Sequence, residues 1–189
     1  MNLILNMFKY LLLAFVFGCE YHVVSPNLDK THVFLRDITF DYIDNFNINN
    51  KYFNNIINLR GDCFNIRSSS GLVGGKLFVG TVAHDAVGYF AYFRKNTTAF
   101  IHDMCIGSAY RGVGVGKQLL SWGLSQIESL PWVSRLELDV LTHNKTAIKL
   151  YESTGFKIIF KFKDRDGEEL FRMSKDITNQ RRRPLRQSK

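Results

Sequence analysis

The sequence predicts one α/β domain, built on a mixed, mostly antiparallel central sheet with helices on both faces. Strand-like segments separated by short turns follow one another from residue 76 to residue 106, which is typical of an antiparallel meander. A glycine-rich turn then leads into a helical run and a further strand, which is typical of a parallel strand–helix–strand unit. At 189 residues the chain is long enough for a single core.

The individual elements follow from the spacing of apolar residues. Residues 32–36 are predicted to be the first strand, and apolar side chains at helical intervals over 41–60 predict one or two amphipathic helices. Seven asparagines in that segment weaken its helix propensity. Residues 68–75 are predicted to be a loop. Farther on, strands are predicted at 76–82, 87–93, 98–106, 135–141, 157–163 and 168–174, with a helix at 115–130 that Pro131 ends.

The turn between residues 106 and 115 is the most informative stretch. Gly112, Gly114 and Gly116 alternate with valines where a strand becomes a helix. Without Cβ atoms the backbone there can approach a bulky anion, and the first free N–H groups of the helix point toward it. The stretch therefore predicts a binding site for a diphosphate.

Two common diphosphate sites do not fit. A P-loop needs Ser or Thr after Gly-Lys to bind magnesium, whereas Gln118 follows Gly116 and Lys117. A dinucleotide fingerprint needs a different interval before its third glycine. The spacing that remains is Arg/Gln-x-x-Gly-x-Gly/Ala, which Arg111, Gly114 and Gly116 satisfy.

This spacing resembles motif A of the GCN5-related N-acetyltransferases, the GNAT superfamily, and is nearest in pattern to the ribosomal-protein and peptide N-acetyltransferases. A second stretch, from Asn144 through Leu150 and Tyr151 to Gly155 and Phe156, resembles motif B of the same superfamily. Both motifs occur in the family's order, on either side of a predicted strand. The resemblance implies a GNAT-type sheet whose two middle strands splay apart at the cofactor site.

The resemblance also implies that acetyl-CoA is the acetyl donor, with no metal required. Main-chain groups of the strand before the turn would hold the pantetheine arm, and backbone N–H groups of the turn would hold the diphosphate. Asn144 would cap the following helix and touch the pantetheine. The residues implied in cofactor binding are Met104, Cys105, Ile106, Arg111, Gly112, Val113, Gly114, Val115, Gly116, Lys117 and Asn144.

Two residues are the predicted catalytic groups. Tyr151 resembles the tyrosine that protonates the departing thiolate in many family members, and a phenol suits a thiolate of comparable basicity. Asp139 lies five residues before Asn144, where the peptide N-acetyltransferases hold Glu, and it is the first candidate for the base. The shorter side chain favours a bridging water. A core role for Tyr151 and a surface role for Asp139 remain open, with Asp103 and His102 as other candidates for the base.

Composition adds three expectations. The cysteines, Cys19, Cys63 and Cys105, are few and isolated, so we expect no disulfide framework and a reducing compartment. Five basic residues after Thr178 account for most of the net charge of +8. That tail is expected to be solvated and accessory, because no basic stripe with interleaved aromatic residues accompanies it, so nucleic-acid binding is not the expected function.

Three segments are therefore expected. Residues 1–19 are a hydrophobic leader. Residues 1–18 can be read as a membrane-docking segment, and the leader can also be a buried N-terminal strand or helix, or the result of a start codon assigned too early. A cytoplasmic location is favoured. Residues 20–177 are the acetyltransferase domain, and 178–189 the basic tail. The predicted function is direct transfer of acetyl from acetyl-CoA to a primary amine of a peptide or small molecule in a ternary complex. The alternative is a non-catalytic acyl-CoA-binding module, and either a monomer or a homodimer is compatible.

Overall fold

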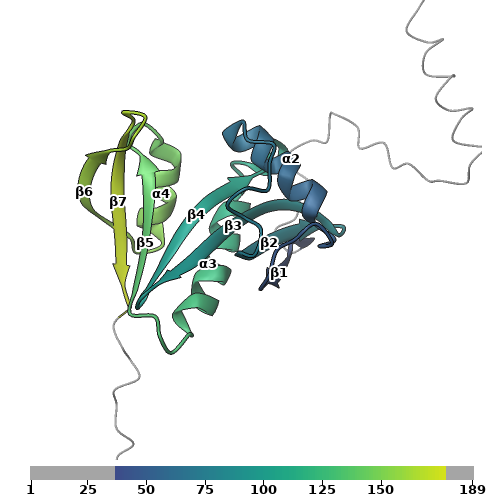
Figure 1. Cartoon of the computed structure of the whole chain (residues 1–189), viewed down its shortest axis with the longest axis horizontal. Helices are drawn as coiled ribbons and strands as arrows, with labels where there is room; N and C mark the ends of the chain where they lie inside the picture. The colour runs from purple at the N-terminus through teal and green to yellow at the C-terminus, as the bar shows by residue number, and fades with distance from the viewer. Residues whose placement is uncertain (1–36, 178–189) are drawn as a thin grey trace, which may run out of the picture. The chain divides into compact units, whose positions relative to one another are not determined.

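The computed structural model describes residues 37–177, which form a seven-stranded sheet with three α-helices (Figure 1). The strands lie in the order β1-β2-β3-β4-β5-β7-β6. The elements are β1 (Thr39–Ile43), α2 (Phe53–Phe64), β2 (Lys76–Val82), β3 (Asp85–Lys95), β4 (Thr98–Ile106), the 3₁₀ turn η2 (Ser108–Tyr110), α3 (Val115–Glu128), β5 (Arg135–Leu141), α4 (Lys145–Ser153), β6 (Lys157–Lys163) and β7 (Glu169–Asp176).

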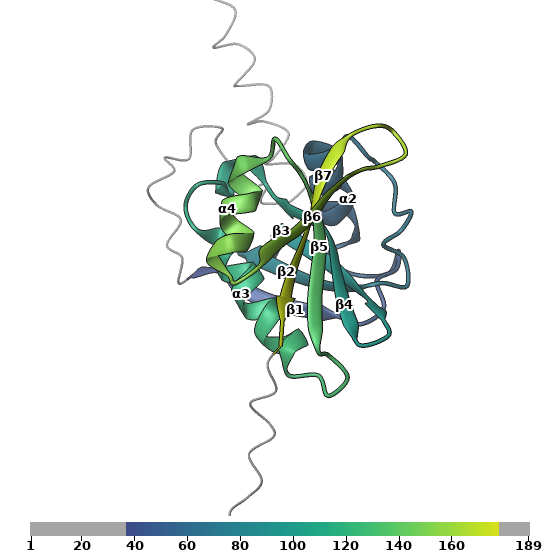
Figure 2. The same cartoon turned by 90° about the vertical axis from the view of Figure 1, so that its left-hand side faces the viewer.

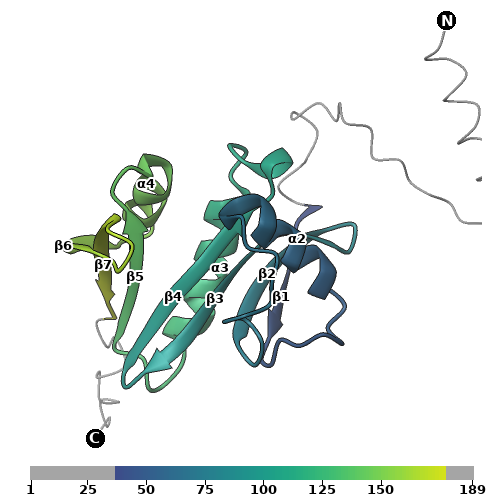
Figure 3. The same ribbon diagram turned by 45° about the horizontal axis from the view of Figure 1, so that its top comes forward.

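The sheet is mixed and mostly antiparallel, as predicted, and only β4 and β5 pair in parallel. Their pairing runs from Thr98 opposite Arg135 to Ile101 opposite Leu138 and then stops. Both strands continue beyond that point, to Ile106 and Leu141. The middle of the sheet therefore splays open, and Figure 3 shows the two strands diverging.

The helices cover both faces of the sheet, which confirms the predicted layering (Figures 2 and 3). On one face α3 and α4 pack on β2–β5, and their shared core includes Phe90, Leu119, Leu136 and Tyr151. Helix α3 approaches β3 closely because Gly123 has no Cβ, which would clash with the Phe90 ring. On the other face α2 covers β1–β4 through a second core that contains Phe46, Ile56, Leu59, Leu72, Leu77, Val79 and Tyr89.

The main difference from the sequence prediction lies before residue 53. The predicted strand at 32–36 falls outside the described residues, and β1 occupies Thr39–Ile43, so helix was the wrong expectation for residues 41–43. Pairing of β1 with β2 decides that conformation. The asparagines that follow form turns, since the side chains of Asn47 and Asn50 accept hydrogen bonds from the backbone N–H two residues on. Helix therefore begins only at Phe53.

The expectation about cysteines was also wrong for two of the three. Cys63 on α2 and Cys105 on β4 form a disulfide, with their Cα atoms 6.0 Å apart and a sequence separation of 42. Spacing along the chain carried no sign of this pair, because it is the packing of α2 onto β4 that brings the two residues together.

The predicted leader (1–19) and basic tail (178–189) lie outside the described residues. Within residues 37–177, no helix is both long and apolar enough to cross a membrane.

Candidate functional site

The glycine turn between β4 and α3 has the backbone conformation that only glycine adopts without strain at two positions. Gly112 has φ +82° and Gly114, the residue that caps α3, has φ +94°. A Cβ built on Gly112 meets no atom within 4 Å, so the turn is open above this residue. Arg111, Gly112, Gly114 and Lys117 are exposed, Val113 and Gly116 are partly buried, and the side chain of Val115 is buried against Val87 and Ile38. The turn thus presents its backbone to solvent while Val115 holds it to the sheet.

Six consecutive N–H groups at this turn have no protein acceptor. The first hydrogen bond of α3 joins the N–H of Gln118 to the carbonyl of Gly114, and within residues 37–177 no carbonyl or side chain accepts from the N–H groups of residues 112–117. The first turn of the helix carries no acidic side chain, so its positive dipole end is not neutralised. Lys117 is exposed beside it. The arrangement suits an anion with several oxygen atoms.

The free edge of β4 leads directly into this turn. Beyond Ile101 the edge of β4 that faces β5 has no strand partner, so the stretch from Met104 to Ile106 offers an unpaired strand edge to an extended ligand, apart from the Ile106 carbonyl that accepts from Arg111. A bulge precedes them, since Tyr89 pairs with Cys105 but Ala91 pairs with His102. Asp103 lies in this bulge with φ +52°. The strand therefore bends where it leaves β5.

Gly116 and Arg111 tie the turn to the neighbouring elements. A Cβ on Gly116 would lie 3.3 Å from Ile106 and 3.7 Å from both Met104 and Leu150, so this glycine lets α3 start close to β4 and α4. The Nε of Arg111 donates to the carbonyl of Ile106 at 2.8 Å, and its Nη2 donates to the sulfur of Cys63 at 3.2 Å. The predicted cofactor residues on β4 and in the turn are thus brought together.

Helix α4 begins as predicted. The side chain of Asn144 accepts a hydrogen bond from the N–H of Ala147 at 3.1 Å and caps the helix. Tyr151 lies within the α3/α4 core, where its ring meets Phe156 edge-on, and only 8% of the residue is exposed. Burial raises the pKa of Tyr151 to about 12. Its hydroxyl therefore keeps its proton at neutral pH, and no group within residues 37–177 hydrogen-bonds to it.

Asp139 lies on the other face of the sheet and is ion-paired. Leu138 and Val140 point into the α3/α4 core, so Glu137 and Asp139 point to the face that carries α2. Arg172 on β7 grips Asp139 with two hydrogen bonds, one from Nε to Oδ1 and one from Nη2 to Oδ2 at 2.9 Å, and it also reaches Glu137 at 3.5 Å. The sheet thus separates the two predicted catalytic side chains, with Tyr151 on one face and Asp139 on the other.

Arg172 is a site residue that the sequence analysis missed. Its guanidinium lies over the rings of Phe100, Phe160 and Phe162, at 4.9, 5.6 and 5.6 Å from their centroids. The hydrogen bond to Asp139 is the leading reason that the pKa of Arg172 is raised. The sequence of 168–174 carries no signal for this role, because only the pairing of β5 with β7 places Arg172 opposite Asp139.

A second buried polar group lies under the bulge. Arg60 of α2, which is 7% exposed, pairs with Asp103 at 2.9 Å and donates to the carbonyls of Ser68 and Ser70. Burial favours the neutral form of Asp103, but His102 and Arg60 outweigh it and hold the pKa of this carboxyl below its usual value. The Tyr89 hydroxyl is buried nearby without a hydrogen-bond partner in the described part of the chain. Sequence reasoning named Asp103 and His102 but not Arg60 or Tyr89.

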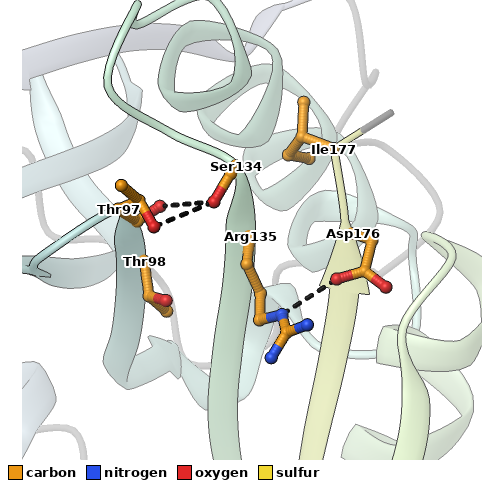
Figure 4. Close-up of a pocket in the computed structure, with 6 residues that line it drawn as sticks. All are labelled: Thr97, Thr98, Ser134, Arg135, Asp176 and Ile177. Carbon is orange, nitrogen blue, oxygen red and sulfur yellow. Dashed lines mark hydrogen bonds and ion pairs between the residues drawn. The ribbon is translucent and has the colours of Figure 1, made fainter. Parts of the chain in front are cut away.

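A separate pocket lies at the other end of β4. Thr97, Thr98, Ser134, Arg135, Asp176 and Ile177 line it, where β4 and β5 begin and β7 ends (Figure 4). Ser134 donates to the Thr97 hydroxyl at 3.0 Å, and Arg135 pairs with Asp176 at 2.8 Å. The polar groups in it are thus already matched to one another. Because the glycine turn follows the opposite end of β4, this pocket is not part of the candidate site.

The splay between β4 and β5, the glycine turn and the capped helix α4 all lie in the part of the chain that one known family matches. The Acetyltransferase (GNAT) family matches residues 50–156, which is more than half of the chain. The protein belongs to this family. Its chain is also 46% identical over 59 residues to the uncharacterized N-acetyltransferase YycN of Bacillus subtilis (strain 168). That match covers 31% of this chain and 37% of YycN, so it reaches well under half of the relative's length.

Solved structures show the same GNAT fold at low sequence identity. The ribosomal-protein-S18-alanine N-acetyltransferase from Escherichia coli superimposes with a TM-score of 0.60 at 19% identity, over 75% of this chain and 94% of that one. A GNAT family acetyltransferase from Elizabethkingia anophelis, with acetyl-CoA bound, gives 0.59 at 13% identity, over 74% and 98%. These likenesses show the fold and confirm the resemblance inferred from the two motifs.

Proposed function

We propose that this GNAT protein binds acetyl-CoA and transfers its acetyl group to a primary amine. The observation that carries the proposal is the run of six peptide N–H groups, from Gly112 to Lys117, that have no acceptor within the described residues. This run begins where the unpaired edge of β4 ends. Together they offer an anion site for a diphosphate and an extended edge for the pantetheine arm, in the order in which these parts occur in acetyl-CoA.

The chain's own residues would hold the donor mainly through the backbone. N–H groups of Gly112–Lys117, with Arg111 beside them, would bind the diphosphate. Main-chain groups of Met104, Cys105 and Ile106 would hold the amide-bearing arm, and the cap residue Asn144 would lie beside it. Acetyl-CoA supplies a thioester that is open to attack by an amine. Because the acceptor amine attacks this carbon directly, the protein needs no nucleophile of its own, and a ternary complex suffices.

Two protons must move during the transfer. Tyr151 is protonated at neutral pH and is the proposed donor to the departing thiolate. Asp139, on the opposite face, is the proposed acceptor for the proton of the amine, through a water because its carboxylate is held by Arg172. The two groups lie on opposite faces of the sheet, which opens between β4 and β5. This supports the two roles, because the attacking amine and the departing thiolate occupy different positions around the carbonyl carbon.

A peptide or protein amine is the proposed acceptor class. The E. coli relative in fold is named as an S18-alanine N-acetyltransferase, and another solved structure of the same fold is a NatC complex bound to a Gag peptide and CoA. A small-molecule amine is the alternative acceptor. A cytoplasmic location is part of the same proposal, because acetyl-CoA is supplied there.

Calorimetric titration of the full-length protein with acetyl-CoA, with ATP as a comparison anion, tests the cofactor. Gly112→Ala is the informative variant and Gly167→Ala its matched control, because both glycines have positive φ (+82° and +85°) and open space around their Cβ positions. Each substitution strains the backbone by about 1 kcal/mol. We expect only Gly112→Ala to weaken acetyl-CoA binding, by about tenfold or more. Equal affinities in both variants would contradict the placement of the diphosphate.

A non-catalytic acyl-CoA-binding module is the second candidate. The ion pair between Asp139 and Arg172 favours it, because both carboxylate oxygens of Asp139 already accept hydrogen bonds from the guanidinium. Incubation with acetyl-CoA and a panel of peptides, lysine derivatives, polyamines and aminoglycosides separates the two candidates. Release of CoA that depends on one of these amines supports the enzyme, whereas tight binding with no release for any of them supports the module.

A further inference from the structure

The disulfide between Cys63 and Cys105 lies against the proposed acetyl-CoA site. Cys105 belongs to the free edge of β4, and Cys63 is on the last turn of α2. The sulfur of Cys63 accepts a hydrogen bond from Arg111, whose Nε binds the carbonyl of Ile106. One covalent bond thus joins α2, the cofactor strand and, through Arg111, the glycine turn.

Besides their apolar packing, α2 and the bent end of β4 are joined by a disulfide and by an ion pair, and of these two links only the disulfide is redox-sensitive. The ion pair between Arg60 and Asp103 lies one helical turn from Cys63 on α2 and two residues from Cys105 on β4. Reduction of the disulfide leaves that pair in place and removes the covalent link next to Met104–Ile106. We therefore expect the strand edge and the turn to lose order without loss of the fold.

The two cysteines have unlike surroundings. Cys105 is 2% exposed, while Cys63 is only partly buried and touches an exposed guanidinium. A neighbouring cation favours the thiolate form, so a reduced Cys63 is the more reactive of the two. A thiolate at Cys63 would also form an ion pair with Arg111, which the neutral disulfide sulfur does not.

We propose that Cys63 and Cys105 form a thiol–disulfide switch that sets the affinity of this protein for acetyl-CoA, with the oxidised form binding more tightly. The switch rests on the function proposed above, since it acts on the same site. In the oxidised form the edge of β4 is fixed against α2, and Arg111 meets a neutral sulfur that does not cancel the charge it offers to the diphosphate. In the reduced form both advantages are lost.

Closure of the switch is an exchange with a small disulfide such as glutathione disulfide. The Cys63 thiolate attacks one glutathione sulfur, so that a mixed disulfide forms and one glutathione thiolate leaves. Cys105 then loses its proton and attacks the sulfur of Cys63, which forms the internal bond and releases the second glutathione thiolate. Two protein thiols are oxidised and one glutathione disulfide is reduced to two glutathione molecules.

The test uses the full-length protein with Cys19→Ser, so that only two cysteines remain. One sample is equilibrated with glutathione disulfide and desalted, and the other is reduced with a phosphine, which adds no thiol to attack the thioester. Alkylation followed by mass spectrometry counts the free thiols in each sample. Calorimetry then gives the dissociation constant for acetyl-CoA, which is used in place of free CoA because the thiol of CoA would itself reduce the bond.

We expect no free thiol in the oxidised sample, two in the reduced sample, and a dissociation constant about fivefold to tenfold higher after reduction. Cys63→Ser and Cys105→Ser are expected to bind weakly with or without the phosphine. Cys105→Ser is expected to bind acetyl-CoA more weakly than Cys63→Ser, because it keeps the free thiol of Cys63 beside Arg111. Circular dichroism checks that each variant is folded, and the two wild-type samples test the switch even if a variant is not.

Three outcomes would overturn the proposal. Two free thiols after oxidation would mean that the bond does not form. Equal affinities in the two redox states would mean that it forms without controlling the site, and would leave the proposed acetyltransferase function standing. Absence of acetyl-CoA binding in both states would contradict the proposed function itself, and the switch with it.

Discussion

Arg172 on β7 lies directly opposite Asp139 on β5 and donates hydrogen bonds to its carboxylate. Three aromatic rings surround the guanidinium of Arg172. The geometry holds Asp139 in one orientation on the face of the sheet opposite Tyr151. Both carboxylate oxygens of Asp139 accept charge-assisted hydrogen bonds from Arg172. The proposed mechanism therefore places a water between the amine and this carboxylate.

Replacement of Asp139 by Asn tests this role. We expect Asp139→Asn to lower kcat by about 100-fold while the KM for acetyl-CoA stays nearly constant, because the loss of a general base affects the proton transfer and not donor binding. Glu137→Gln is the matched control, since Glu137 lies on the same strand and face and also meets Arg172. We expect it to change kcat by less than about threefold. Similar effects of both substitutions would indicate a role in holding Arg172 instead.

Tyr151→Phe tests the proposed acid. Phenylalanine fills the same space beside Phe156, so we expect the free energy of unfolding and the affinity for acetyl-CoA to change little. Loss of the hydroxyl removes the proton donor and is expected to lower kcat by about 100-fold with amines of ordinary basicity. Steady-state kinetics at saturating donor provide the measurement. A variant with unchanged kcat would show that Tyr151 serves only the core.

Alkaline pH should destabilise the protein through the same residue. Burial raises the pKa of Tyr151 to about 12, whereas an unfolded tyrosine ionises near 10. The native state therefore binds more protons than the unfolded state between these values, and stability falls as pH rises through that interval, by about 2 to 3 kcal/mol for this residue. Urea unfolding at several pH values should show a smaller loss for Tyr151→Phe. Burial also raises the pKa of Tyr89 and Tyr92, so a part of the loss should remain.

Local signals account for the elements that the sequence predicted correctly. Runs of residues that favour strands marked 76–82, 98–106, 135–141 and 157–163, and each became the predicted strand. In 135–141 every second residue is buried, as the alternation there predicts. Asn144 was predicted to cap α4, and its side chain does so; Gly155, two residues after the end of the helix, has φ +95°. Each of these features depends on neighbours within a few residues.

The features that sequence reasoning missed depend on distant neighbours. Strand β1 owes its conformation to pairing with β2, which lies more than thirty residues away, and its apolar residues fit a helical pattern equally well. Arg172 joins the site only through the pairing of β5 with β7, and Cys63 meets Cys105 only through the packing of α2 on β4. Contacts of this kind leave no periodic signal in a single chain.

Reduction of the disulfide should lower the stability of the whole protein. A bond that closes a loop of this length restricts the unfolded chain and contributes about 3 kcal/mol, so we expect the melting temperature to fall by roughly 10 °C after treatment with a phosphine. The Cys19→Ser protein is suitable for this measurement. The variant that also carries Cys63→Ser and Cys105→Ser should melt near the reduced protein and not respond to the phosphine. A reduced protein that melts at the oxidised temperature would show that the bond constrains little.

Acetyl-CoA should in turn protect the disulfide. Acetyl-CoA binding and disulfide formation are two coupled equilibria. Oxidation lowers the dissociation constant for acetyl-CoA by some factor, and saturating acetyl-CoA must raise the equilibrium constant for disulfide formation by the same factor. Titration with glutathione and glutathione disulfide, read by alkylation of free thiols, should show the midpoint moving toward more reducing mixtures by that factor. ATP at the same concentration should not move it. A midpoint that stays constant while the two redox states differ in affinity would violate this linkage, and would mean that one of the two measurements reports on something other than this site.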